Sequence, residues 1–249
     1  MEKIKINSPL IEAVCEIQFS NQPNWDTAIP DKLYDRLKDQ FPIRSKRIKR
    51  ECEGIDEEGD SVKIKKTEYE LFIQENKKIE VLIDHYGTII IRVLKPYPSW
   101  DTFKSIIGFT LSNLSEIINI ENVSKIRLYY YNIVDTKLPE VKLENYFRFK
   151  PFINKDLPQT ICDFIVGCEY PFDEKSVICR TVVTMISDDK DSSNNIKYSF
   201  SIDYKTNIES PIKYDFEQLL DWMERGHNRI ESVFYGSISK RYKNKILGG

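Results

Sequence analysis

The chain has 249 residues, of which 41% are hydrophobic, 12% aromatic and 31% charged. Aromatic and branched apolar side chains are abundant enough to offset the entropy lost on ordering, so the composition excludes a disordered chain and predicts a globular protein. The 37 basic and 39 acidic residues give a net charge of -2. This balance excludes attraction of the whole molecule to nucleic acid or to an anionic membrane, and leaves only a local patch for such a partner.

The sequence gives no sign of a membrane segment or of a metal site. No stretch approaches the ~20 apolar residues that span a bilayer, and the first residues lack the apolar core of a signal peptide. The five cysteines are odd in number and contain no Cys-x-x-Cys pair, which favours reduced thiols over disulfides or zinc. We therefore expect a cytoplasmic protein with no metal and no cofactor.

The first half of the chain alternates between strand-like and helix-like periodicity. Residues 13–19 alternate polar and apolar side chains, which predicts a strand with one wet face. Ser99 is a typical N-cap and precedes apolar residues at helical spacing. We predict helices over 31–41 and 99–118, and further strands over 43–53, 62–74, 79–85, 88–94 and 125–134.

The second half repeats the order of strands followed by a helix. We predict strands over 163–169, 176–186 and 197–204 and a helix over 215–235. The following residues Lys240, Arg241, Lys243 and Lys245 form either a second basic cluster or a solvated, partly frayed tail. The expected fold class is therefore α+β, with mainly antiparallel sheets, long helices packed on them, and two related lobes. Prolines cluster after residue 135 and place the boundary there, between an N-terminal α+β lobe (1–135) and a C-terminal β-rich lobe (136–249) that ends in a long helix.

Three segments of the chain carry motifs that match a known family. The segment 8–19 contains Pro-Leu-Ile-Glu-Ala-Val-Cys-Glu-Ile-Gln-Phe, the segment 126–133 ends in Tyr-Asn-Ile, and the last helix contains His-x-x-Ile-x-x-x-Phe. The sequence resembles a family of uncharacterised, sporadically distributed prokaryotic proteins with such segments. The positions that carry this resemblance, which we call the signature residues, are Pro9, Leu10, Glu12, Glu16, Phe19, Asn132, His227 and Phe234.

Two sets of signature residues could perform chemistry. Glu12 and Glu16 lie on one face of the predicted strand, where paired carboxylates could divide acid and base roles or bind a cation; alternatively they form cross-strand ion pairs, for example with Arg127. His227 has Glu224 one turn before it and Glu231 one turn after it. That arrangement suggests a metal-assisted hydrolase completed by Glu12 or Glu16, but a structural or polar packing role for His227 at a helix–sheet interface is favoured.

Two further groups of residues are candidates for contact with a partner. Arg127, Tyr129 and Tyr131 share one face of a predicted strand, and these residue types are enriched at protein interfaces. They could also bind a ligand by stacking on a base or contacting a phosphate, or could form a packed tyrosine face. Basic residues on two neighbouring strands could form a phosphate-binding patch, or could simply protect a sheet edge from pairing. The residues of this nucleic-acid alternative are Arg44, Lys46, Arg47, Lys49, Arg50, Lys63 and Lys65.

The sequence has no Gly-rich phosphate loop, nucleophile elbow or dinucleotide motif, and we assign no catalytic residue. We therefore expect a non-enzymatic binding or regulatory subunit that acts through a protein partner. The resemblance implies an accessory protein whose patchy distribution suggests antiphage-defence or toxin–antitoxin systems. Nucleic-acid binding through the basic strands and hydrolysis centred on His227 are the alternatives. A homodimer through the edge strand 43–53 is also compatible with the pattern.

Overall fold

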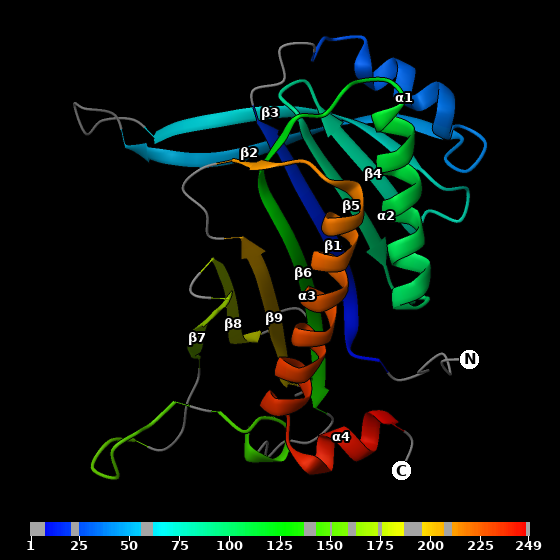
Figure 1. Cartoon of the computed structure of the whole chain (residues 1–249). Helices are drawn as coiled ribbons and strands as arrows, with labels where there is room; N and C mark the ends of the chain where they lie inside the picture. Colours follow the sequence, from blue (N-terminus) through cyan, green and yellow to red (C-terminus); the bar gives the residue numbers. More distant parts are fainter. Residues whose placement is uncertain are drawn as a thin grey trace.

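The computed structural model describes residues 8–20, 25–55, 62–136, 143–149, 151–158, 163–173, 176–186, 196–206 and 211–247, without the side chains of 51–55, 62, 63 and 196. Within these ranges, ten strands form one antiparallel sheet in the order β2-β3-β4-β5-β1-β6-β9-β8-β7, with β10 beside β6 (Figure 1). The strands are β1 (Leu10–Ser20), β2 (Ile43–Ile55), β3 (Val62–Ile73), β4 (Ile79–Asp84), β5 (Thr88–Leu94), β6 (Asn122–Thr136), β7 (Ile165–Phe172), β8 (Val177–Ile186), β9 (Ile196–Thr206) and β10 (Ile212–Lys213).

The predicted fold class is wrong. We expected several sheets in two related lobes with long helices packed on them, whereas the described strands belong to one sheet that dominates the fold. The reason lies in β6, which pairs with β1 on one side and with β9 on the other. The strands expected in separate lobes are therefore continuous through hydrogen bonds. The division of the chain at residue 135 stays a prediction.

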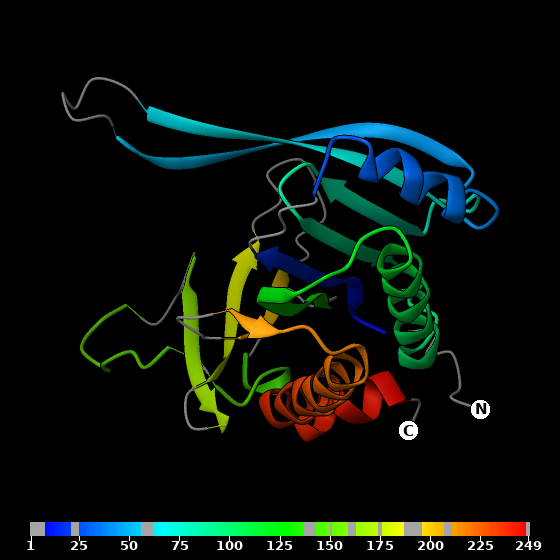
Figure 2. The same cartoon turned by 45° about the horizontal axis from the view of Figure 1, so that its top comes forward.

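Four α-helices accompany the sheet: α1 (Ile29–Leu37), α2 (Trp100–Ser115), α3 (Phe216–Ser237) and α4 (Lys240–Leu247). Both longer helices begin at the capping residue that their sequence favours. The Ser99 hydroxyl accepts a hydrogen bond from the Thr102 backbone N–H, and the Asp215 carboxylate accepts one from the Gln218 N–H. Helices α1, α2 and α3 lie on the same side of the sheet (Figure 2). We call this side the helix face and the other side the open face.

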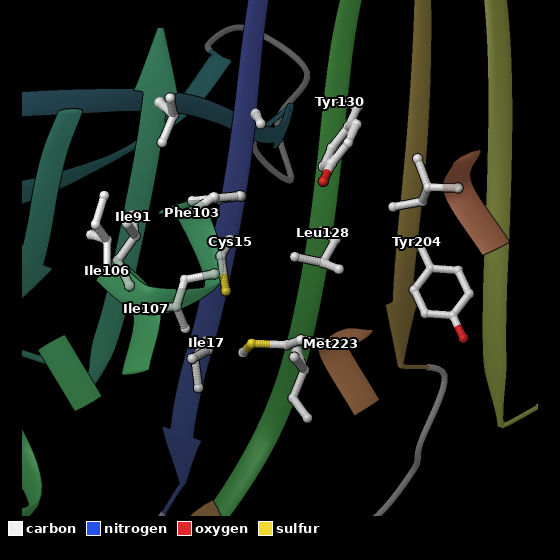
Figure 3. Packing of buried hydrophobic residues seen from close by; sticks show 14 of the residues in the cluster. Cys15, Ile17, Ile91, Phe103, Ile106, Ile107, Leu128, Tyr130, Tyr204 and Met223 are labelled. Atoms are coloured by element: carbon white, nitrogen blue, oxygen red, sulfur yellow. The ribbon is translucent and has the colours of Figure 1, made fainter. Parts of the chain in front are cut away.

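The core lies between the helix face of the sheet and the apolar sides of α2 and α3. Cys15 of β1 and Leu128 of β6 point toward Phe103 of α2 and Met223 of α3, and all four side chains are fully buried (Figure 3). Along β1 and β6 buried residues alternate with half-buried ones, as the period of two requires. This alternation decides which side chains reach the helices and which remain on the open face.

The β2–β3 hairpin extends well beyond the rest of the sheet (Figures 1 and 2). Strand β4 pairs only with the end of β3 that runs from Tyr69 to Ile73, so most of the long hairpin has two strands. Strand β2 forms one edge of the sheet and β7 the other. Among the described residues, no helix is both long enough and apolar enough to cross a lipid bilayer.

Candidate binding pocket

Five of the eight signature residues line a single pocket on the helix face. Its volume is about 190 Å³, and its walls come from residues 8–10, the 95–99 loop, β6, β9 and helices α2, α3 and α4. The segments that carry the resemblance at the start, middle and end of the sequence therefore meet at one place. The signature residues in the wall are Pro9, Leu10, Asn132, His227 and Phe234.

His227 is held in the pocket wall by two aromatic neighbours. Its ring stacks on the indole of Trp100, with ring centroids 4.3 Å apart and planes 5° apart. Its Nδ1 lies 2.8 Å from the Tyr130 hydroxyl, with which it shares a hydrogen bond. Burial lowers the pKa of His227 to about 4, against the opposing charges of Glu224 and Asp101. The imidazole is therefore neutral at pH 7, and hydrogen bonding rather than charge is its chemical role.

The position of Trp100 is fixed by a carboxylate one turn before His227. The indole Nε1–H donates to Glu224 Oε2 at 2.9 Å, and the Lys104 ammonium donates to the same oxygen at 2.8 Å. These hydrogen bonds lower the pKa of Glu224, and the bond from Lys104 has the larger effect. The carboxylate therefore serves to join α2 to α3 and to hold the indole against the imidazole.

Helix α3 approaches the sheet closely at the residue before His227. A Cβ atom at Gly226 would lie 2.8 Å from the Tyr204 ring and 3.1 Å from Leu128 Cδ1, so only glycine fits without displacement. One turn away, Arg229 donates to both carboxylate oxygens of Asp173 and to the Tyr204 hydroxyl. Together these contacts fix the distance between α3 and the sheet. They thereby place His227 within hydrogen-bonding distance of Tyr130.

The floor of the pocket is formed by β6. Tyr130 is buried, and burial followed by its interaction with Tyr97 raises its pKa well above the ordinary value. The phenol therefore stays neutral. The next residue on the same face, Asn132, is also buried and donates its Nδ2–H to the Phe200 carbonyl at 3.0 Å. The carboxamide is thereby oriented, and its Oδ1 remains as an acceptor for which the described residues provide no donor.

The remaining signature residues lie away from the pocket. Phe19 packs in the core beside Trp25 and Tyr214. Glu12 lies on the open face, 3.3 Å from Arg92. Glu16 lies on the same face, where its oxygens accept hydrogen bonds from the Lys125 ammonium and the Arg127 guanidinium of β6.

The Glu16 ion pairs confirm the cross-strand alternative. Glu16 Oε1 lies 2.7 Å from Lys125 Nζ, and Oε2 lies 3.2 Å from Arg127 Nη1. Burial raises the pKa of Glu16, but these hydrogen bonds and charges outweigh it and leave the pKa below its ordinary value. Arg127 also pairs with Asp203 on β9. The carboxylate is thus ionised and fully engaged, which is unsuitable for a general acid.

Only part of the hydrolase alternative is brought together. Glu231 lines the pocket with His227 but is exposed to solvent, Glu12 and Glu16 lie on the open face, and Glu224 binds Trp100 and Lys104. Within the described ranges, no three His, Cys, Asp or Glu side chains are grouped to hold a metal ion. The geometry therefore gives this alternative no support.

Arg127, Tyr129 and Tyr131 do share a face, as their alternation predicts, and it is the open face. The Arg127 guanidinium lies over the Tyr129 ring, 4.8 Å from its centroid. In register with these residues, β9 contributes Asp203 and Ser201. The group therefore belongs to an aromatic and charged surface at the centre of the sheet.

The basic strands do not form one positive surface. Arg44 pairs with Asp31 and Glu70 on the helix face, and Lys46 pairs with Glu68 and Glu70. The other partly neutralised residue is Arg47, which pairs with Glu80 on the open face. Lys49, Arg50 and Lys65 are exposed, and the side chain of Lys63 lies outside the described residues.

A search of protein-family models and a search of curated proteins each found no match to this sequence. The family resemblance therefore stays a prediction. The residues that the sequence interpretation missed are Trp100, Tyr97 and Tyr130, which complete the pocket around His227. One signal was available for Tyr130, because strand alternation places it on the same face as Asn132; nothing in the sequence spacing links Trp100 to His227.

Proposed function

We propose that this protein is a non-enzymatic binding or regulatory subunit that acts through a protein partner bound on the open face of the sheet. The observation that supports the proposal is a row of half-buried side chains running across the face toward the β7 edge. Tyr131 on β6 lies opposite Ser201 on β9, which lies opposite Val182 on β8. On β7, Ile165 extends the same face and is 72% exposed. We call Tyr129, Tyr131, Val182 and Ile165 the open-face patch.

The composition of the open-face patch suits a protein partner. Tyrosine and arginine are enriched where proteins bind one another, and a large apolar side chain at a sheet edge costs solubility unless a partner covers it. Arg127 beside the patch is already neutralised by Glu16 and Asp203. A partner can therefore cover the ion pairs without leaving an isolated charge buried.

The resemblance adds a suggestion about the setting. It favours a partner that belongs to an antiphage-defence or toxin–antitoxin system, in which this chain would be a sensor, subunit or neutralising component. Nucleic-acid binding is less favoured, because Arg44, Lys46 and Arg47 are paired with carboxylates. Releasing them for phosphates would cost those ion pairs.

The test is capture of the partner by matched surface variants. Tyr131→Lys places a charge in the open-face patch, whereas Tyr86→Lys makes the same exchange in the β4–β5 turn, where Tyr86 is 77% exposed. We expect the wild-type chain and the Tyr86→Lys variant, expressed in the native host, to co-purify with one protein in stoichiometric amount, and the Tyr131→Lys variant to lose it. Equal capture by the two variants would show that the partner does not bind the open face.

Thermal unfolding of both variants provides the control for folding. Arg127 is unsuitable for this test, because its ion pairs with Glu16 and Asp203 join β1, β6 and β9 and its removal would destabilise the sheet. Tyr131 is half-buried and lies on the open face, so its replacement affects chiefly the surface. A loss of capture together with unchanged Tm therefore reports binding.

A further inference from the structure

The size of the pocket on the helix face limits what it can hold. A dry protein cavity of about 150 Å³ accommodates one benzene molecule, whereas pockets for drug-sized ligands begin at about 300 Å³. At about 190 Å³, the pocket has room for one six-membered ring with one or two small substituents. Its walls provide flat apolar surfaces for such a ring, from Tyr97, Phe234 and Pro96.

The inner wall of the pocket carries no net charge. His227 is neutral at pH 7 because burial lowers its pKa to about 4, and the Tyr130 phenol is neutral as well. Two charged side chains, Lys95 and Glu231, line the pocket but are exposed to solvent. An ionised ligand would therefore lose its hydration inside without gaining a buried counter-charge, which disfavours its binding.

Two polar atoms in the wall retain hydrogen-bonding capacity. The Asn132 Nδ2–H donates to the Phe200 carbonyl, so Oδ1 is left to accept. The His227 Nδ1 is engaged by the Tyr130 hydroxyl, so Nε2 is left on the other side of the ring. A buried acceptor gains most from a ligand that brings a donor, because an unpaired polar group costs free energy in an apolar site.

From this geometry we propose that the pocket binds a small, uncharged aromatic molecule of one ring, which bears a hydroxyl or ring N–H that donates to Asn132 Oδ1. The ring packs against Tyr97 and Phe234, and His227 Nε2 offers a second hydrogen bond at the ring edge. This ligand site lies on the opposite side of the sheet from the open-face patch. The inference goes beyond the proposed partner and does not rest on it.

The test compares four probes of nearly equal size: phenol, toluene, benzoate and benzylammonium. Binding to the full chain is measured by isothermal titration and by ligand-observed NMR at pH 7. We expect phenol to bind, toluene to bind about two- to tenfold more weakly because it lacks the donor, and the two ions not to bind detectably. Absence of phenol binding at millimolar concentration would overturn the proposal, as would equal binding of benzoate and phenol.

Matched variants locate the site. Ile246→Phe fills the pocket from α4, where Ile246 is buried, and Ile212→Phe makes the same exchange at a half-exposed position on β10. We expect the first variant to lose phenol binding and the second to retain it. Should Ile246→Phe fail to fold, His227→Phe decides the question, because it keeps a ring against Trp100 while removing Nε2. Unchanged phenol binding in a folded pocket variant would refute the site. Capture of a protein partner is measured separately, so failure of either proposal leaves the other intact.

Discussion

Replacing Gly226 by alanine tests whether the contact between α3 and the sheet is as tight as the geometry indicates. In a helix interior alanine is favoured over glycine by about 1 kcal/mol. At Gly226, however, the added methyl carbon would lie 2.8 Å from Tyr204 Cε1, and overpacking of a buried site typically costs about 1–3 kcal/mol. The Tyr204 ring is fully buried and its hydroxyl accepts a hydrogen bond from Arg229, so it has little freedom to move. We expect a net loss of up to about 2 kcal/mol.

The matched control is Gly108→Ala in the middle of α2. There the new methyl would meet Phe216 at 3.9 Å and Leu220 at 4.0 Å, which are ordinary van der Waals distances. The same exchange should therefore stabilise the protein by up to about 1 kcal/mol. Urea unfolding measures both changes in stability, and thermal unfolding should show a Tm lower by up to roughly 8 °C for Gly226→Ala. If Gly226→Ala stabilises the protein as much as Gly108→Ala does, the close approach of α3 is not real and the position assigned to His227 is wrong.

Three further predictions concern ionisable groups. The pKa of His227 is about 4 in the folded state and about 6.5 in the unfolded chain, so protonation favours unfolding as the pH falls between these values. The free energy of unfolding of the wild type, measured with urea, should fall by roughly 3 kcal/mol over this pH range. The His227→Phe variant should show a smaller loss in the same assay. Glu16→Gln should cost about 2 kcal/mol in the same assay, because it weakens two charge-assisted hydrogen bonds on a buried sheet surface, while Glu68→Gln at an exposed pair should change nothing measurable. Arg229→Lys should lower stability by about 1 kcal/mol, since lysine cannot make the forked contact with Asp173; equal stability of this variant and wild type would show that the contact is not formed in solution.

The positions of most elements could be predicted from periodicity. The predicted strands from 13–19 to 197–204 all overlap observed strands, and the helices that begin at Ser99 and Asp215 have the expected caps. Periodicity describes one element at a time, however, and does not say which strands pair. For this reason the pairing of β6 with β1 on one side and with β9 on the other could not be predicted from the sequence. This pairing joins the strands of the two expected lobes into one sheet.

The basic C-terminal segment was interpreted as a second basic cluster or as a solvated, partly frayed tail. It forms helix α4, in which Tyr242 and Ile246 are buried. The two apolar residues are four positions apart, so they lie on one side of the helix, while Lys240 and Lys245 are exposed. Composition alone hid this pattern, and with it the residue that closes one side of the pocket.

The pocket required information that sequence spacing does not contain. His227 and Trp100 are separated by more than a hundred residues, and their stacking depends on how α2 and α3 cross on the sheet. Burial also makes His227 unsuited to the acid–base role that the hydrolase alternative requires, because an imidazole with a pKa of about 4 is a poor base at pH 7. The same residue that suggested a metal-assisted hydrolase from its sequence neighbours is a neutral hydrogen-bonding group in the fold.

The polar signature residues form two sets, which differ in whether their polar atoms are all bonded within the fold. On the open face, Glu12 forms an ion pair with Arg92, and Glu16 forms ion pairs with Lys125 and Arg127. Both carboxylates therefore interact with other residues of the sheet. On the helix face, Asn132 and His227 each use one polar atom in a hydrogen bond within the fold, and both residues line the cavity. A ligand can gain from the second set and not from the first. The proposed ligand site therefore depends on neutral residues whose hydrogen bonds the fold leaves incomplete, and not on the carboxylates Glu12 and Glu16.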